Sequence, residues 1–247
     1  MALWQPFSLA PGAMAAALLG QTEEVARLAM WGYTPLHHAS LHGQIQIVQL
    51  LLDTGSDVNI KTEFGQTPLH LAQGVGGWQA CWQGAEGTQF RMPAGQRDLV
   101  VRNLLDAGAL VDALTKFGDT PLHFGAASGN EVRVQMLLDA GADIAQTDNE
   151  GSTPLHLGAQ YGRCSVVRLL LHKGADLNTR NGRGETPEDL ASLRQHDRAA
   201  ALLRVMAKRA WNLPREAFAM GQHERLGARS LILDLEPGVV RMILDRF

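Results

Sequence analysis

The stretch Gly118-Asp119-Thr120-Pro121-Leu122-His123-Phe124-Gly125-Ala126 decides the fold, because its core, Thr-Pro-Leu-His, is repeated along the chain. The spacing between the starts of successive copies is 33, 53, 33 and 33 residues. A fixed period of this length predicts a protein built from stacked structural repeats. The copies are Thr34–His37, Thr67–His70, Thr120–His123 and Thr153–His156, with a worn fifth, Thr186-Pro187-Glu188-Asp189.

The residues of one period predict two helices and an extended loop. Thr34 can cap a helix through its hydroxyl, and Pro35 fits the first helical turn, where a missing N–H costs nothing. Gly43 ends this short helix, and the apolar run 45–52 predicts a second helix that ends near Gly55. Residues 57–65 then read as an extended excursion with a turn. One such unit cannot bury its apolar side chains alone, so it must stack on a neighbour.

The period and the Thr-Pro-Leu-His motif together resemble the ankyrin-repeat family. This resemblance implies an all-α repeat solenoid in which helix-turn-helix units carry β-hairpin fingers. It implies that the histidine of each motif bonds to the backbone around the turn. It also implies that the finger tips and the first helices line a concave surface that binds other proteins.

The repeats divide the chain into three expected parts: an N-terminal segment (1–12), a repeat domain (13–210) and a short helical tail (211–247). A degenerate cap and a basic, polar capping repeat are expected at the two ends of the domain, since terminal repeats need a polar outer face. The expected units are the cap 13–33, the repeats 34–66, 67–119, 120–152 and 153–185, and the capping repeat 186–210.

The second repeat is longer than its neighbours because an insertion at 74–96 separates its two helices. The insertion is rich in Gly and Gln and has no period, which predicts a loop. Its aromatic residues Trp78, Trp82 and Phe90 are candidate binding anchors, since aromatic side chains are enriched in binding hot spots. An inert insertion is the alternative, because loops tolerate extra residues at small entropic cost.

The composition argues against several function classes. A formal net charge of −3 over 247 residues gives no general reason to expect nucleic-acid or membrane binding. No apolar run is long enough to span a bilayer. Cys81 and Cys164 form neither a metal-ligand spacing nor a disulfide framework, which favours a reducing compartment. We therefore expect the cytoplasm, with the nucleus as an alternative.

The histidines do not indicate an enzyme or a metal site. The four motif histidines occur once per repeat, and packed helices lie about 8–10 Å apart. Zinc needs ligand nitrogens about 2.0–2.1 Å from one ion, so these residues form a ladder rather than a ligand shell. No zinc-protease motif, nucleophile elbow or phosphate loop is present, and Cys81 has no visible base partner. We expect no catalysis, no cofactor and no metal.

The residues before each Thr-Pro are expected at the finger tips, where a partner would bind. Phe64 and Phe117 occupy equivalent tips, and an exposed aromatic pair is a hot-spot candidate. The alternative is that both rings fold against the neighbouring finger. The other candidates are Glu63, Gln66, Asn149, Gln160 and Tyr161, with a mixed-charge rim of Lys116, Asp119, Glu150 and Arg183 that would steer a partner.

The first functional hypothesis is therefore a scaffold or adaptor that docks a protein segment on the concave face. A second is a substrate-recruiting subunit of a ubiquitin ligase, which the tail would bind. Leu235-Glu236-Pro237 and the amphipathic run Val239–Phe247 are similar to the opening of an F-box. Leu226-Gly227, Leu231 and the same run resemble the box that ends some ankyrin ligase adaptors, without its upstream Leu-Cys-Arg. A short helical cap is the alternative.

A third hypothesis makes the protein a substrate of an asparaginyl hydroxylase. Asn59 follows Asp57-Val58, and Asn178 follows Asp176-Leu177, each eight residues after a leucine of the second helix. This spacing resembles the pattern that such enzymes modify in ankyrin repeats. The alternative is a turn asparagine that bonds within its own hairpin.

Overall fold

The computed structural model describes residues 32–74 and 95–211. These ranges contain ten helices and no strand. The helices are α3 (Pro35–Leu41), α4 (Ile45–Asp53), α5 (Pro68–Ala72), α6 (Gln96–Asp106), α7 (Pro121–Ser128), α8 (Glu131–Asp139), α9 (Pro154–Gln160), α10 (Cys164–His172), α11 (Pro187–Leu193) and α12 (Asp197–Trp211).

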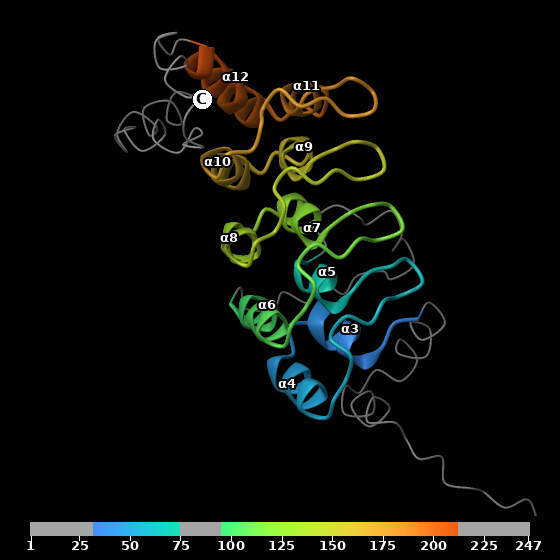
Figure 1. Ribbon diagram of the computed structural model, residues 1–247. Coiled ribbons are helices and arrows are strands. Elements are labelled where there is room, and N and C mark those ends of the chain that lie inside the picture. Colours follow the sequence, from blue (N-terminus) through green and yellow to red (C-terminus); the bar gives the residue numbers. More distant parts are fainter. Residues whose placement is uncertain (1–31, 75–94, 212–247) are drawn as a thin grey trace, which may run out of the picture.

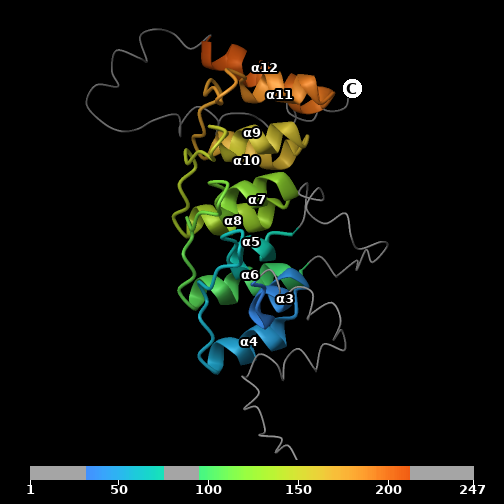
Figure 2. The same cartoon turned by 90° about the vertical axis from the view of Figure 1, so that its right-hand side faces the viewer.

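The described helices form a stack of pairs (Figure 1). The short helices that begin at each Thr-Pro, α3, α5, α7, α9 and α11, lie in one row, and their partners α4, α6, α8, α10 and α12 lie in a second row beside it. Extended loops project from the row of short helices, on the side away from the second row. The view turned by 90° shows successive pairs layered one on another (Figure 2). This is the helical solenoid that the period predicts.

Each short helix starts through the same local chemistry, as the third copy illustrates. Thr120 has extended backbone angles and Pro121 occupies the first turn. The Nδ1 atom of His123 accepts from the Thr120 N–H at 3.1 Å, and the opposite nitrogen, Nε2, donates to the carbonyl of Ser152 at 3.0 Å. The ring therefore ties a helix start to the end of the following loop, as the family resemblance implies.

The other three motif histidines repeat this arrangement. His37, His70 and His156 bond at Nδ1 to the N–H of their own threonine, at 3.1 Å in each case. At Nε2 they bond to the carbonyls of Gln66, Asp119 and Glu185, at 3.0, 3.2 and 3.2 Å. The expected histidine ladder is confirmed.

The core is continuous along the stack because each repeat contributes the same positions. The leucine of each Thr-Pro-Leu-His motif is buried, and the second helices α4, α6, α8 and α10 each bury a valine and a leucine three residues apart. These residues are Leu36, Leu69, Leu122 and Leu155, with Val48 and Leu51, Val101 and Leu104, Val134 and Leu137, and Val167 and Leu170. Full burial of one such side chain is worth roughly 1.5–3 kcal/mol.

Four fingers join the repeats, namely residues 56–66, 109–119, 142–152 and 175–185. Each ends in a turn closed by two backbone bonds, such as Thr115 N–H to Asp119 O at 3.0 Å and Gly118 N–H to Thr115 O at 3.1 Å. Neighbouring fingers are linked by Lys116 N–H to Phe64 O, by Asn149 N–H to Phe117 O and by Gly182 N–H to Glu150 O, at 2.9, 2.9 and 2.7 Å. The expected β-hairpins are thus single turns rather than strand pairs in the described residues, because too few bonds link the extended arms to form a ladder.

Several expected segments lie outside the described residues. These are the N-terminal segment 1–12, nearly all of the cap 13–33, most of the insertion 74–96 and nearly all of the tail 211–247. Their boundaries remain predictions. Within the described residues, α6 begins at Gln96, the last residue of the expected insertion.

None of the helices in the two described ranges combines the length and the apolar character that a membrane span requires.

Candidate protein-binding surface

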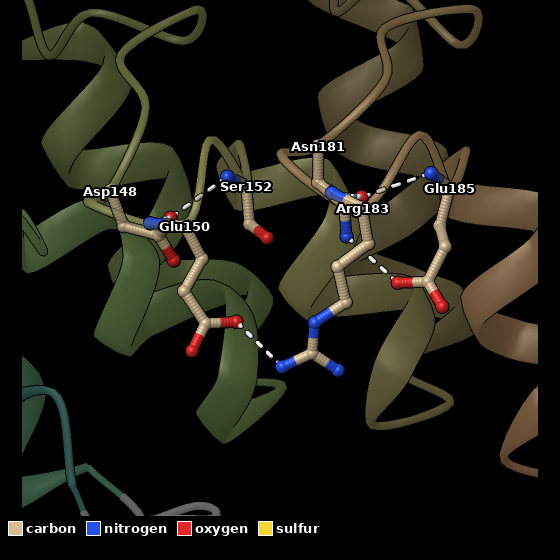
Figure 3. Close-up of polar contacts among 6 residues, drawn as sticks. All are labelled: Asp148, Glu150, Ser152, Asn181, Arg183 and Glu185. Carbon is tan, nitrogen blue, oxygen red and sulfur yellow. Dashed lines mark hydrogen bonds and ion pairs between the residues drawn. The ribbon is translucent and has the colours of Figure 1, made fainter.

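The finger tips are held by a side chain at the start of the turn, which accepts from two backbone N–H groups in the last three described fingers and from the Gln66 N–H in the first. Figure 3 shows two consecutive tips. Asp148 Oδ1 accepts from the N–H groups of Glu150 and Ser152, both at 2.8 Å. Asn181 Oδ1 accepts from those of Arg183 and Glu185, at 3.0 and 2.9 Å. Such turns fix the backbone of the tip before any partner arrives, which lowers the entropic cost of binding.

Charged residues at consecutive tips lie side by side. Arg183 Nη2 is 3.3 Å from Glu150 Oε2, and both side chains are exposed (Figure 3). An exposed pair of this kind contributes about 0–1 kcal/mol to stability, so it is better placed to orient a partner than to hold the fold. Lys116 and Asn149 are also exposed, and Asn149 Nδ2 donates to the Lys116 carbonyl at 3.0 Å.

The two equivalent phenylalanines differ in exposure. Phe117 is 46% exposed, whereas Phe64 is half-buried. Glu63, beside Phe64, is exposed. The two rings thus occupy the same position in their repeats but differ in exposure, and Phe117 is the more accessible one.

The finger 109–119 carries two further exposed apolar side chains, which were not among the residues predicted from the sequence. Leu110 is 57% exposed and Leu114 is 43% exposed. A comparison of the four fingers could have found them, because the other fingers carry polar residues at the same positions. These residues are Asp57, Asp143 and Asp176 opposite Leu110, and Lys61, Thr147 and Arg180 opposite Leu114.

Asp119 was expected on the charged rim but lies in the interior, with 1% of its surface exposed. It sits at the base of the finger, where its N–H donates to Thr115 Oγ1 at 3.1 Å. Burial raises the pKa of its carboxyl to about 7, with a smaller contribution from the Asp148 carboxylate. Gln66, at the same position in the first finger, is half-buried and accepts from the Tyr33 hydroxyl at 2.9 Å.

The remaining sequence candidates fall in three places. Gln160 and Tyr161 are half-buried at the end of α9, and burial raises the pKa of the Tyr161 hydroxyl. Asn59 and Asn178 lie in the turns near the start of the first and fourth fingers. The aromatic anchors of the insertion, Trp78, Trp82 and Phe90, lie outside the described residues.

The asparagines have different surroundings. The half-buried Asn59 accepts from the Leu110 N–H at 2.7 Å and donates to the Gly108 carbonyl at 3.3 Å, which links two repeats. Asn178 is exposed, and its own N–H donates to Asp176 Oδ1 at 2.9 Å.

The motif histidines are committed to the backbone at both ring nitrogens. Burial lowers the pKa of His37 and of His70 to about 4, and it also lowers those of His123 and His156. In the ranges 32–74 and 95–211, no group of three or more His, Cys, Asp or Glu side chains is placed to hold a metal ion. The described surface offers exposed apolar and charged contacts on a fixed backbone.

Comparison with known families decides the classification. A model described as ankyrin repeats (3 copies) matches residues 92–181, and one described as ankyrin repeats (many copies) matches residues 20–72. The chain is an ankyrin-repeat protein. Ankyrin repeats imply a protein–protein interaction module, and repeats of this family are typically non-enzymatic.

Individual relatives match only in part. Ankyrin repeat and SOCS box protein 16 of Mus musculus is 38% identical over 96 residues, which are 39% of this chain and 18% of the relative. Neurogenic locus notch homolog protein 1 of Xenopus laevis is 32% identical over 115 residues, 40% of this chain and 4% of the relative. A probable E3 ubiquitin-protein ligase of Oryza sativa subsp. japonica is 39% identical over 67 residues, which are 26% of this chain and 14% of the relative. The chain therefore spans less than a fifth of each of these relatives.

Proposed function

We propose that this ankyrin-repeat protein is a scaffold or adaptor that holds a segment of a partner protein on the concave face of the stack. The observation that carries the proposal is the apolar character of one finger. Leu110, Leu114 and Phe117 are all more than 40% exposed within eight residues of chain, at positions where other fingers are polar except for Phe64. Exposed apolar clusters with a polar rim are typical of protein-binding sites.

Energetics support Phe117 as the centre of this surface. A half-exposed aromatic side chain gives up part of the free energy that its burial would supply to folding. In an interface, such anchors commonly contribute about 2 kcal/mol or more, while the rim contributes selectivity. Lys116 precedes Phe117, and Glu150 and Arg183 occupy the same tip position in the next two fingers, so a charged rim flanks the ring.

The test compares Phe117→Ala with Leu50→Ala. Leu50 is 52% exposed, similar to Phe117, but it lies on α4 in the second row of helices. Full-length wild type and both variants would serve as baits, with bound proteins quantified by mass spectrometry. We expect Phe117→Ala to lose at least one specific partner that wild type and Leu50→Ala retain, with melting temperatures matched within a few degrees. Equal partner profiles for the two variants would contradict a binding site at this finger.

A second candidate function is recruitment of substrates to a ubiquitin ligase through the tail, residues 211–247. Its support is the similarity of a few tail residues to ligase-binding boxes and the names of two relatives. A chain that ends at Ala210 keeps the described repeats. Ligase components bound by the full chain and lost with the tail would favour this function, whereas identical partners for both chains would reject it.

A further inference from the structure

Asp119 is a buried carboxylic acid that lacks the hydrogen bonds a buried carboxylate needs. Its Oδ1 atom has no hydrogen-bond partner in the described part of the chain. Its Oδ2 atom has only a long contact with Thr115 Oγ1, at 3.5 Å. The backbone of Asp119 is held on both sides, by Thr115 at the N–H and by the His70 ring at the carbonyl. The side chain is thus fixed in position with acceptor capacity left over.

The same position in other fingers is satisfied from within the chain. Gln66 Oε1 accepts from the Tyr33 hydroxyl at 2.9 Å, and Glu185 Oε2 accepts from Asn181 Nδ2 at 3.0 Å. In the finger of Asp119, Thr115 stands where Asn181 stands in the last finger. The Thr115 hydroxyl oxygen already accepts from two backbone N–H groups, and it has no second donor group to offer. In the described part of the chain, no side chain supplies Asp119 with the donor that Asn181 supplies to Glu185.

The electric field around Asp119 favours a cation. The negative charges of Asp148 and Glu150 in the next finger raise the pKa of the Asp119 carboxyl further, in addition to the larger effect of burial. The Tyr161 hydroxyl is also affected by the charge of Asp119. Its pKa is raised, mainly by burial, so it is neutral in the ordinary pH range. The His70 ring is neutral as well and spends its Nε2–H on the Asp119 carbonyl. Arg183 pairs with Glu150, at the exposed tip.

We propose that Asp119, with Asp148 and Glu150 around it, receives one lysine or arginine side chain from the partner segment. This inference rests on the proposed binding function, because the apolar finger that carries Phe117 also carries Asp119 two residues further on. Ammonium and guanidinium groups donate several hydrogen bonds and form the strongest ones with carboxylates. An unpaired buried charge costs more free energy than one that is paired and hydrogen-bonded. The partner segment is therefore expected to carry a basic residue for Asp119 next to an apolar residue that packs against the exposed finger.

The pairing is linked to protons. A cation beside Asp119 stabilises the ionised carboxylate, so binding releases a proton near neutral pH. With a free-state pKa of about 7, the ionised fraction of Asp119 rises about tenfold between pH 6 and pH 8. Affinity for the cation should rise by about the same factor over this interval.

The test uses Nα-acetyl-argininamide as the probe and Nα-acetyl-citrullinamide as its neutral match. Each would be titrated into the full, ¹⁵N-labelled chain and followed by backbone amide NMR. We expect saturable shifts of the amides at 115–119 and 148–150 with the arginine probe alone, a dissociation constant about tenfold lower at pH 8 than at pH 6, and loss of the shifts in Asp119→Asn. Equal shifts with the citrulline probe, or shifts that persist in Asp119→Asn, would overturn the proposal.

Two controls distinguish a receptor for a partner's cation from a structural carboxylate and from an inorganic cation site. Asp119→Asn removes a buried unpaired charge, so its melting temperature should equal or exceed that of wild type; a marked fall would show a structural role and contradict the proposal. Calcium chloride titrated in place of the arginine probe should leave these amides unmoved, since tighter, saturable shifts would assign an inorganic cation instead. Both variants would then be tested for binding to a partner once one is found. If Phe117→Ala loses binding and Asp119→Asn does not, only the role proposed for Asp119 is rejected. If both variants bind as wild type does, the proposed function is rejected as well.

Discussion

Arg133 donates an Nη1–H to the carbonyl oxygen of Ala72, 2.9 Å away in the preceding repeat. Ala72 is the last residue of α5, the shortest of the motif helices, which ends just before the insertion. Arg133 is buried, and its Nε lies 3.6 Å from Asp98 Oδ1. A cation at a helix C-terminus is favourable, and here it also caps a carbonyl that a shortened helix leaves open. The other second helices carry apolar residues at this position, namely Ile47, Val100, Val166 and Ala199.

This arrangement predicts that Arg133→Leu is destabilising, although the other second helices carry apolar residues at the equivalent position. Burial lowers the Arg133 pKa to about 10, so the side chain is still charged at neutral pH. Its removal leaves the Ala72 carbonyl and the Asp98 carboxylate without their partner. We expect the free energy of unfolding to fall by about 2–4 kcal/mol in urea titrations followed by circular dichroism. The control Arg102→Leu, at an exposed position on α6, should change it by less than about 0.5 kcal/mol. Equal effects of the two variants would show that the contacts of Arg133 add nothing net.

Gln195 has a left-handed backbone, with φ of 60°, at the position that Gly162 occupies in the previous repeat with φ of 65°. Only glycine adopts this conformation without steric cost, which is roughly 1–2 kcal/mol for other residues. Gln195→Gly should therefore raise the free energy of unfolding by about 0.5–1 kcal/mol, after the greater flexibility of glycine in the unfolded chain is counted. The measurement is a urea titration at neutral pH.

The reverse change at Gly162 is the matched control. A Cβ there would lie 2.7 Å from the His196 ring as well as strain the backbone. Gly162→Ala should lower the free energy of unfolding by more than about 1 kcal/mol. Changes of the same sign at both positions would contradict this account.

The repeat fold could be predicted from the sequence because the same residue pattern occurs in each repeat. Thr120, Pro121 and His123 encode a helix start through local bonds, and the same three residue types recur at a fixed period. Burial of Leu122 and its equivalents follows, since a unit with exposed leucines must stack. The histidine role follows only from family resemblance, and the structure confirms it.

The candidate surface was harder to predict because exposure depends on packing between repeats. Phe64 and Phe117 share a register but differ in burial, and Asp119 is interior although its neighbours are exposed. Leu110 and Leu114 are visible only when fingers are compared with one another. Periodicity thus fixes which residues are equivalent, while the contacts of each finger with the next decide what each residue can do.

The histidine ladder predicts loss of stability in mild acid. Burial lowers the pKa of His37 and of His70 to about 4, below the value of 6.5 for an unperturbed histidine. Between these values the unfolded chain binds more protons than the folded one, so the free energy of unfolding falls as pH decreases from 6.5 to 4. Each of these two histidines can account for up to about 3 kcal/mol of this loss.

Urea titrations at several pH values between 7 and 4 test the ladder. In His70→Gln, the amide can replace both hydrogen bonds but cannot be protonated. This variant should therefore lose less stability than wild type between pH 6.5 and 4. The control His172→Gln, outside the motif on α10, should keep the wild-type pH dependence. Parallel curves for wild type and His70→Gln would reject the ladder as the origin of acid sensitivity.

Asn59 and Asn178 occupy the same position in different fingers, yet only Asn59 is seen to join two repeats. Its side chain bonds to the Leu110 N–H and the Gly108 carbonyl, whereas Asn178 is exposed. Asn59→Ala should lower the free energy of unfolding by about 1–2 kcal/mol, and Asn178→Ala by less than about 0.5 kcal/mol. Chemical denaturation of the two variants measures this difference, and equal losses would contradict the bridging role.

The same asymmetry bears on the proposed hydroxylation. A modifying enzyme must reach the side chain, and moving the first finger away from the second would break both inter-repeat bonds of Asn59. We therefore expect any added oxygen to accumulate at Asn178 before Asn59 when both peptides are followed by mass spectrometry of protein from cells. Asn59→Ala, which frees the first finger, should leave modification of Asn178 unchanged because the two fingers are separated by two others. Unmodified masses for both peptides would end the hydroxylation hypothesis, and preferential modification of Asn59 would show that its finger opens more readily than these two hydrogen bonds imply.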